Sequence, residues 1–198
     1  MKISKSWIII PLLMVLVVSM SGCISDSIFK EGITYKANGI EFQYPDSWHV
    51  VNTVAEGAKG AVADKKNPSI STVIQEVPTE LGTDIQSACS NNNKNLVKSP
   101  NYINIQENKT TVKGKEVIVH RYLVNEPDGT QKEHVATWMK MSDNRVYVLL
   151  FSAPVSEYEF QRSSYDLVVG TFALQQDQKS SIFDSLSSAV NKFFTGSG

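Results

Sequence analysis

Three histidines, His49, His120 and His134, are the side chains of this sequence that could most readily act as metal ligands, acids or bases near neutral pH. No known catalytic motif accompanies them. The chain has no Gly-x-Ser-x-Gly elbow, no His-Glu-x-x-His helix, no phosphate-binding glycine-rich loop and no Cys-x-x-Cys pair. We therefore expect no enzyme of a familiar class, no catalytic residues and no bound cofactor.

Two of the histidines fall on neighbouring strands of a predicted hairpin. A tight turn at residues 127–129 places Tyr122 opposite His134 and His120 diagonal to His134 on the same face of the sheet. Diagonal neighbours lie about 7 to 8 Å apart, so two imidazoles could share a metal ion. However, no cysteine or third ligand is evident nearby, and Lys132 would repel a cation. We expect partly exposed histidines packed beside Tyr122, without a metal.

The N-terminal residues have the three zones of a secretory signal. Lys2 and Lys5 are followed by an apolar run at residues 7–18 and then by small or unbranched residues. The apolar run is interrupted by Pro11, and it is shorter than the roughly 20 residues that a membrane-spanning helix needs. A permanent transmembrane helix is therefore not expected.

The signal ends in Met20-Ser21-Gly22-Cys23, which resembles the lipobox of bacterial and archaeal lipoproteins. The resemblance implies that Cys23 is lipidated and becomes the first mature residue. We therefore expect the chain to be held at the outer face of the cell membrane by lipid on Cys23. The alternative is an ordinary signal peptide cleaved near Ser21, which would leave the Cys23 thiol unmodified.

The mature chain has the size of one ordinary domain. Of the 19 Lys and Arg, two lie within residues 1–22, so 17 remain against 20 Asp and Glu. Nucleic acid is not expected as a partner, because a basic face is missing. Lipidation of Cys23 would leave Cys89 without a disulfide partner. Helical spacing around Cys89 places it on a buried stripe, where we expect an inert thiol.

Hydrophobic periodicity predicts mostly strands, with two helices that could cover them. Strands are expected at residues 39–44, 48–51, 61–64, 71–77, 102–112, 115–126, 130–141, 145–153 and 171–174. Helices are expected at residues 81–99 and 155–170. Turn residues at 113–114, 127–129 and 143–144 separate the long central strands, which should form a meander.

A two-residue loop at 143–144 would fix the pairing of the last two central strands. The predicted pairs are Met141 with Val146, Met139 with Val148, and Trp138 with Leu149. Both faces of these strands are apolar, so helices must cover both. We therefore predict a three-layer α+β domain, an antiparallel sheet between helices, with Trp48 and Trp138 in its core.

Residues 38–48, NGIEFQYPDSW, resemble the opening of PsbP-like domains, in which an aromatic strand runs into Pro and then Trp. Phe160 and residues 165–172, YDLVVGTF, are similar to the last helix and strand of that family. The resemblance covers nearly the whole mature domain. It implies the PsbP-like α/β/α fold and a non-catalytic module that docks on other proteins.

The remaining features complete the predicted organisation of the chain. It comprises a signal peptide at residues 1–22, a spacer at 23–33, a PsbP-like domain at 34–174 and a C-terminal linker and helix at 175–198. The C-terminal helix is amphipathic, and its apolar face could pack on its own domain, on a partner or on lipid. Asn108 begins an Asn-Lys-Thr glycosylation sequon.

Two functions fit these observations. The first is a protein-interaction module that presents a surface to another envelope protein. The second is an extracytoplasmic carrier of a small ligand or metal. A pocket lined by polar groups would favour the second function, whereas a closed core with an exposed apolar patch would favour the first.

Overall fold

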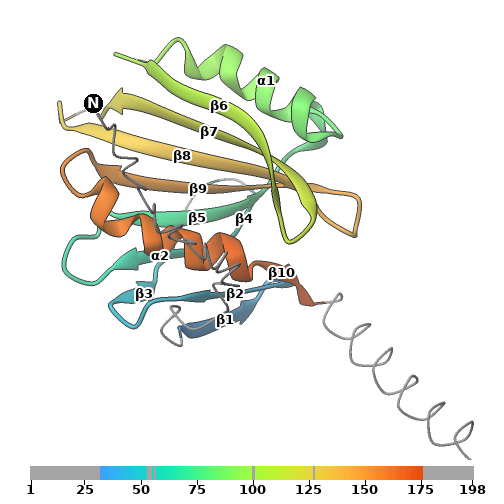
Figure 1. The fold of residues 1–198 in the computed structure, drawn as a ribbon, viewed down its shortest axis with the longest axis horizontal. Coiled ribbons are helices and arrows are strands. Elements are labelled where there is room, and N and C mark those ends of the chain that lie inside the picture. Colours follow the sequence, from blue (N-terminus) through green and yellow to red (C-terminus); the bar gives the residue numbers. More distant parts are fainter. Residues whose placement is uncertain (1–31, 53–54, 56, 100, 127, 176–198) are drawn as a thin grey trace, which may run out of the picture.

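The computed structural model describes residues 32–175 except 53–54, 56, 100 and 127 (Figure 1). The signal segment, the predicted lipidation of Cys23 and the predicted C-terminal helix after residue 175 lie outside these residues. Within the part of the chain described, no helix combines the length and apolar character needed to cross a membrane.

The described chain contains strands of two sheets, two α-helices and one short 3-10 helix. In chain order, the first elements are β1 (Ile33–Ala37), β2 (Ile40–Tyr44), β3 (Trp48–Val50), β4 (Ala58–Asp64), β5 (Ser71–Glu76), the 3-10 helix η1 (Thr79–Leu81) and α1 (Ile85–Leu96). They are followed by β6 (Ile103–Val112), β7 (Lys115–Asn125), β8 (Gln131–Lys140), β9 (Val146–Pro154), α2 (Tyr158–Thr171) and β10 (Ala173–Leu174).

The larger sheet is antiparallel, with seven strands in the order β3-β4-β5-β9-β8-β7-β6, and the smaller sheet has the order β1-β2-β10. Helix α1 lies beside β7 and β8, whereas α2 lies beside β9 and β2 (Figure 1). The predicted α+β fold, an antiparallel sheet between helices with a meander at β6 to β9, is confirmed. The pairing of β5 with β9 joins β3, β4 and β5 to the meander and completes the larger sheet.

Two hydrophobic clusters occupy the two faces of the larger sheet, as the apolar character of both faces predicts. One cluster contains Trp48 and packs against α2 and the small sheet. The other contains Trp138 and packs against α1. Both tryptophans are buried, so their predicted core positions are confirmed.

The predicted pairing of β8 with β9 is wrong by one residue. Trp138 pairs with Val148, and Lys140 pairs with Val146. The loop has three residues rather than two, because Met141 donates its backbone N–H to the carbonyl of Arg145 and Asn144 adopts a positive φ of 65°. A slip of one residue moves every β9 side chain to the opposite face. Tyr147 therefore packs with Met139 instead of with Trp138.

Several element boundaries also differ from those predicted. Strand β1 begins at Ile33, the last residue of the predicted spacer, and continues into the predicted domain. It is not among the predicted strands, although residues 38–39 form a tight turn with positive φ that pairs β1 with β2. Helix α1 begins at Ile85 rather than near Leu81, because the Asp84 side chain accepts a hydrogen bond from the Ser87 backbone N–H at 2.9 Å and caps the helix there.

Candidate functional site

A cleft lies between α2 and the outer strands of the larger sheet, on the face that the Trp48 cluster shares. We call it the α2 cleft, and its volume is about 310 Å³. The residues that line it are Gln106, Asn108, Thr110 and Val112 of β6, Val119 and Arg121 of β7, Val135 and Thr137 of β8, and Tyr158, Arg162, Tyr165, Asp166 and Val169 of α2. Most of these side chains are polar.

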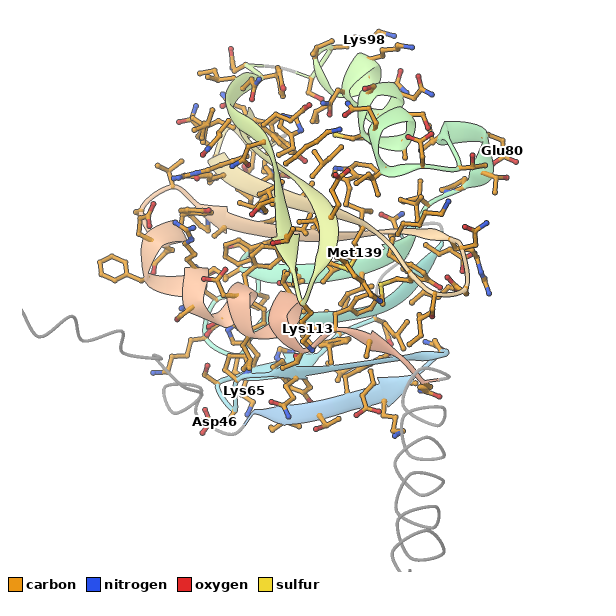
Figure 2. The ribbon with its side chains drawn as sticks, turned by 45° about the vertical axis from the view of Figure 1, so that its right-hand side comes forward. Asp46, Lys65, Glu80, Lys98, Lys113 and Met139 are labelled. Carbon is orange, nitrogen blue, oxygen red and sulfur yellow. The ribbon has the colours of Figure 1, made fainter. Side chains whose placement is uncertain are left out.

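The regular geometry of the surrounding elements explains this lining. Alternate residues of a strand point to the same face, so every second residue of β6 from Gln106 onward enters the cleft. The α2 residues recur at helical spacing from Tyr158. At one end, the β6–β7 hairpin carries Lys113 at its tip, close to the C-terminal part of α2 (Figure 2). Lys113 shares a small cavity there with Val169 and Phe172.

Arg121 is held firmly at the β7 side of the cleft. Its guanidinium hydrogen-bonds the nearly buried carboxylate of Glu133, contacts Glu159 at 3.2 Å and lies 4.4 Å from the centre of the Tyr158 ring. The hydrogen bond with Glu133 raises the pKa of Arg121 further above its usual range. Arg121 is thus a fixed cation whose main partner is internal.

Arg162 is the less constrained cation of the cleft. Its Nε atom lies 4.0 Å from Asp166 Oδ2, at the limit of an ion pair, and both side chains are more than half exposed. Partial burial raises the pKa of Asp166, and the positive charge of Arg162 acts in the opposite direction and lowers it. Because an exposed pair of this kind contributes little free energy, Arg162 can exchange Asp166 for another anion at low cost.

The floor of the cleft is polar, and its Tyr165 hydroxyl is protonated and hydrogen-bonded within the domain. The Tyr165 hydroxyl lies 2.6 Å from Thr137 Oγ1 and donates to the Leu149 carbonyl at 2.9 Å. Burial raises the pKa of Tyr165, so the hydroxyl stays protonated. No Cys, His, Ser or Lys is among the described residues that line the cleft. The lining can therefore bind polar and anionic groups, but it offers no activated nucleophile or neutral-pH base.

The histidines predicted to share a face do so, on the other side of the sheet from the cleft. Tyr122 pairs with His134, as predicted, and their rings stack with centroids 5.1 Å apart. The predicted partial exposure is wrong, because His120 is 0% and His134 is 7% exposed under the Trp138 cluster. Burial lowers the pKa of His134 to about 4, with a smaller effect from Lys132. The two histidines have different partners.

His134 accepts or donates a hydrogen bond at Nδ1 with Ser152 Oγ, 2.8 Å away. His120 instead contacts the Tyr102 hydroxyl through Nε2 at 3.1 Å. The third histidine, His49, is exposed on β3 and takes no part in either arrangement. Lys132, the predicted source of repulsion, lies 3.7 Å from Glu126 and is partly neutralised by it.

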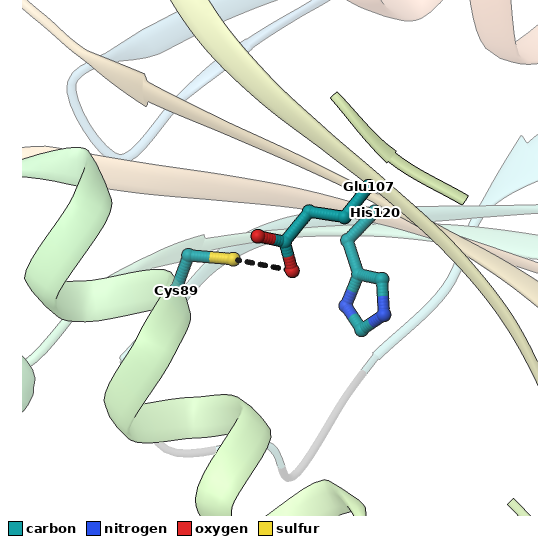
Figure 3. Close-up of side chains that lie close together, drawn as sticks. All are labelled: Cys89, Glu107 and His120. Carbon is teal, nitrogen blue, oxygen red and sulfur yellow. Dashed lines mark hydrogen bonds between the residues drawn. The ribbon is translucent and has the colours of Figure 1, made fainter. Parts of the chain in front are cut away.

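Cys89 is buried, as its helical spacing predicts. Its Sγ atom lies 3.9 Å from Glu107 Oε2, and together with His120 these residues form a compact cluster (Figure 3). The expectation that no cysteine lies near the histidines is therefore wrong for His120. The tight turn at residues 113–114 could have revealed Glu107, because it pairs Glu107 with His120, whereas the position of Cys89 depends on how α1 packs.

The cysteine thiol in this cluster is not reactive by itself. Burial, reinforced by the charge of Glu107, raises the pKa of Cys89 to about 12, so the thiol is protonated at neutral pH. Burial also lowers the pKa of His120. Asn108, the first residue of the Asn-Lys-Thr sequon, is exposed on β6 and lines the α2 cleft on the opposite face.

Comparisons with known proteins agree on one fold. The sequence model of the PsbP family matches residues 31–174. The solution structure of cyanobacterial PsbP (CyanoP) from Synechocystis sp. PCC 6803 has a TM-score of 0.53 at 16% identity, covering 76% of this chain and 96% of CyanoP. No curated protein matches the sequence.

Two further solved structures are similar. LpqN, described as involved in cell envelope biogenesis of Mycobacterium tuberculosis, has a TM-score of 0.50 at 13% identity, covering 73% of this chain and 86% of LpqN. A point mutant of the protein Mog1 has a TM-score of 0.51 at 10% identity, covering 73% of this chain and 96% of Mog1. At these identities the likeness establishes the fold and not a shared activity.

Proposed function

This chain belongs to the PsbP family, and from that premise we propose that it is a membrane-anchored, extracytoplasmic and non-catalytic module that binds a segment of another envelope protein in the α2 cleft. The α2 cleft is the observation that carries the proposal. Its described lining combines hydrogen-bonding side chains with the exchangeable cation Arg162 and has no catalytic constellation. Such a lining suits recognition of a polar segment that carries a carboxylate.

The position of the cleft supports recognition of a polypeptide. Its outer wall is β6, which is the last strand of the larger sheet in the described chain, and the β6 residues are exposed except for Val112 at the end. A partner segment can therefore approach along this side without displacing another element. Neighbouring Asn108 and Thr110 offer hydrogen-bonding groups to the backbone or side chains of such a segment.

The proposed location rests on the signal segment and on Cys23. A lipid-anchored domain is confined to the membrane surface, so modest affinity for another envelope protein is enough for binding. LpqN, which has this fold, is described as involved in cell envelope biogenesis.

Site-specific photocrosslinking in native membranes tests the proposed docking surface. A photoreactive side chain at Asn108 points into the α2 cleft, whereas the same group at Thr111 lies on the same strand but points to the other face. We expect a discrete crosslinked product from position 108 and at least tenfold less from position 111. Equal products from both positions would contradict docking in the cleft.

A pair of charge reversals tests which residue recognises the partner. Arg162→Glu should lower the yield of the position-108 product about tenfold or more, because it replaces the exchangeable cation with an anion. Lys94→Glu is the matched control, since Lys94 is exposed on α1 beyond the opposite face. A product that survives Arg162→Glu would show that the cleft does not recognise an acidic group.

Carriage of a small polar ligand is the second candidate function. The volume of about 310 Å³ lies at the lower end of the range for small-molecule pockets, and the lining is polar. Native mass spectrometry of the chain extracted from its own membrane separates the two functions. A retained small molecule that is lost in Arg162→Glu would favour the carrier, whereas a crosslinked polypeptide favours the interaction module.

A further inference from the structure

A second cluster of ligand-type side chains lies across the sheet from the α2 cleft. Cys89 comes from α1, Glu107 from β6 and His120 from β7. One donor atom from each lies within 4.8 Å of the other two (Figure 3). A thiol, a carboxylate and an imidazole from three different elements therefore converge on one small volume.

Two residues at this cluster carry buried polar atoms that have no hydrogen-bond partner among the described residues. His120 is fully buried, and its Nδ1 atom has no hydrogen-bond partner among the described residues. Its other ring nitrogen contacts the Tyr102 hydroxyl at 3.1 Å, and the ring presents a nitrogen on the side of Cys89 and Glu107 (Figure 3). Buried polar atoms are nearly always paired, so an unpaired imidazole nitrogen that faces a thiol and a carboxylate indicates a missing partner.

Asn93 supplies a second unsatisfied atom. Its Nδ2 atom donates to Glu107 Oε2 at 2.7 Å and lies 3.7 Å from Cys89 Sγ, while its buried Oδ1 atom has no partner in the part of the chain that is described. The amide thus orients the carboxylate, and its unpaired acceptor is bonded to the same carbon as the Nδ2 atom that contacts the cluster. A water molecule bound to a cation at the centre could donate to that acceptor.

We propose that Cys89, Glu107 and His120 form a binding site for one Zn²⁺ ion, with a water molecule in the fourth position that donates to Asn93. Thiolate, imidazole and carboxylate are the three kinds of ligand that zinc takes in proteins, and together they favour zinc over the harder Mg²⁺ and Ca²⁺. Binding replaces the Cys89 S–H bond with an S–Zn bond and releases the proton to solvent, without oxidation or reduction.

The geometry needs only a small contraction. Ligand bonds of about 2.0 to 2.3 Å in a tetrahedral site place donor atoms roughly 3.5 Å apart. The present separations, all within 4.8 Å, therefore have to close by about 1.3 Å at most. The exposed Glu107 can provide much of this movement by side-chain rotation. Tyr102 fixes the His120 ring from outside, as the outer partners of metal-bound histidines commonly do.

A bound ion would join α1 to the outer edge of the sheet. Cys89 anchors it to the helix, and Glu107 anchors it to β6, whose other face forms the wall of the α2 cleft. The site lies outside the α2 cleft, and the zinc proposal does not depend on what that cleft binds.

Cobalt titration of the full chain in detergent, carrying Cys23→Ala, tests the site. Cys23 and Cys89 are the two cysteines of the sequence, so this background leaves Cys89 as the thiol that can give a thiolate-to-cobalt absorption band. We expect that band to saturate at one Co²⁺ per chain and to disappear when Zn²⁺ displaces the cobalt. Absence of the band at saturating Co²⁺ would overturn the proposal.

Two glutamate-to-glutamine variants test whether the Glu107 carboxylate binds the metal ion. Glu107→Gln should weaken Co²⁺ binding at least tenfold, and because Glu107 is exposed the variant should fold normally. Glu116→Gln is the matched control, an exposed carboxylate on the neighbouring strand β7, and should bind as the parent does. Equal affinity in the two variants would exclude Glu107 as a ligand and refute the proposed site. Circular dichroism checks that each variant retains its fold.

Discussion

At the scale of single residues, the buried polar side chains distinguish this sheet from a purely apolar one. His134 stacks on Tyr122 and hydrogen-bonds Ser152 while 7% exposed. A neutral imidazole suits this environment, because it can exchange a hydrogen bond with the hydroxyl and needs no counterion. Protonation would place a cation in the core.

This environment predicts that stability falls in mild acid. The pKa of His134 is about 4 in the folded chain against 6.5 ordinarily, so the unfolded chain binds the proton first. The contribution of neutral His134 is complete above pH 6.5 and is lost as the pH falls toward 4, amounting to about 3 kcal/mol. The free energy of unfolding, measured with urea, should therefore fall more steeply between pH 7 and 4 than it does in His134→Gln. Parallel pH profiles would show that His134 does not titrate with a lowered pKa.

Trp138 allows a second test at the residue scale. It is 2% exposed beneath α1, so Trp138→Ala should cost about 3 to 5 kcal/mol by emptying a buried aromatic site. Thermal unfolding should shift by roughly 10 °C or more. Trp138→Phe should cost much less, since it keeps a ring and removes an Nε1 atom that has no partner among the described residues. A shift of only a degree or two for Trp138→Ala would contradict its core role.

At the scale of elements, turn chemistry sets which residues face each other. The β6–β7 turn uses Lys113 and Gly114 with φ of 49° and 75°, a two-residue hairpin turn that pairs Val112 with Lys115. This register places Glu107 opposite His120 and directs Asn108 to the other face. Both surfaces of β6, one on the α2 cleft and one on the proposed zinc site, therefore depend on the same turn.

Two glycine substitutions should have opposite effects on stability. A Cβ at Gly114 meets no atom within 4 Å, but its φ of 75° disfavours L-residues, so Gly114→Ala should lower the free energy of unfolding by about 1 kcal/mol. A Cβ at Gly170 also meets no atom within 4 Å, and Gly170 lies within helix α2. Gly170→Ala should therefore raise the free energy of unfolding by about 0.5 to 1 kcal/mol. Urea unfolding measures both. Effects of the same sign would mean that the turn or the helix is assigned wrongly.

At the scale of the whole molecule, we propose a different binding site on each face of the larger sheet. The face that carries α2 presents a polar cleft, and the face that carries α1 contains the cluster around His120. The predicted lipid on Cys23 would hold both at the membrane surface.

Anchoring through one side chain leads to a direct prediction. Cys23→Ala should leave the chain exported but no longer bound to the membrane, because the signal segment is too short to span it permanently. Fractionation with a carbonate wash measures the distribution, and Cys89→Ala provides a matched control that should remain in the membrane fraction. Retention of Cys23→Ala in the washed pellet would indicate an uncleaved signal anchor instead.

Local patterns in the sequence were sufficient to predict the class of fold and much of its layout. Alternation and helical spacing predict the long strands β6 to β9 and both helices, because side-chain direction repeats with a fixed period in each. The turns at residues 113–114 and 127–129 determine their hairpin registers locally, and the pairing of Tyr122 with His134 follows. Burial of Trp48 and Trp138 follows from the apolar faces.

The remaining features depend on contacts between residues far apart in the chain. Asp143 and Asn144 are compatible with loops of two or three residues, and only the folded hairpin selects the longer one and so determines the face of every β9 side chain. The pairing of β5 with β9, the α2 cleft and the approach of Cys89 to His120 arise when separate elements pack together. No local period encodes such packing, because its free energy comes from surfaces that meet only in the tertiary structure.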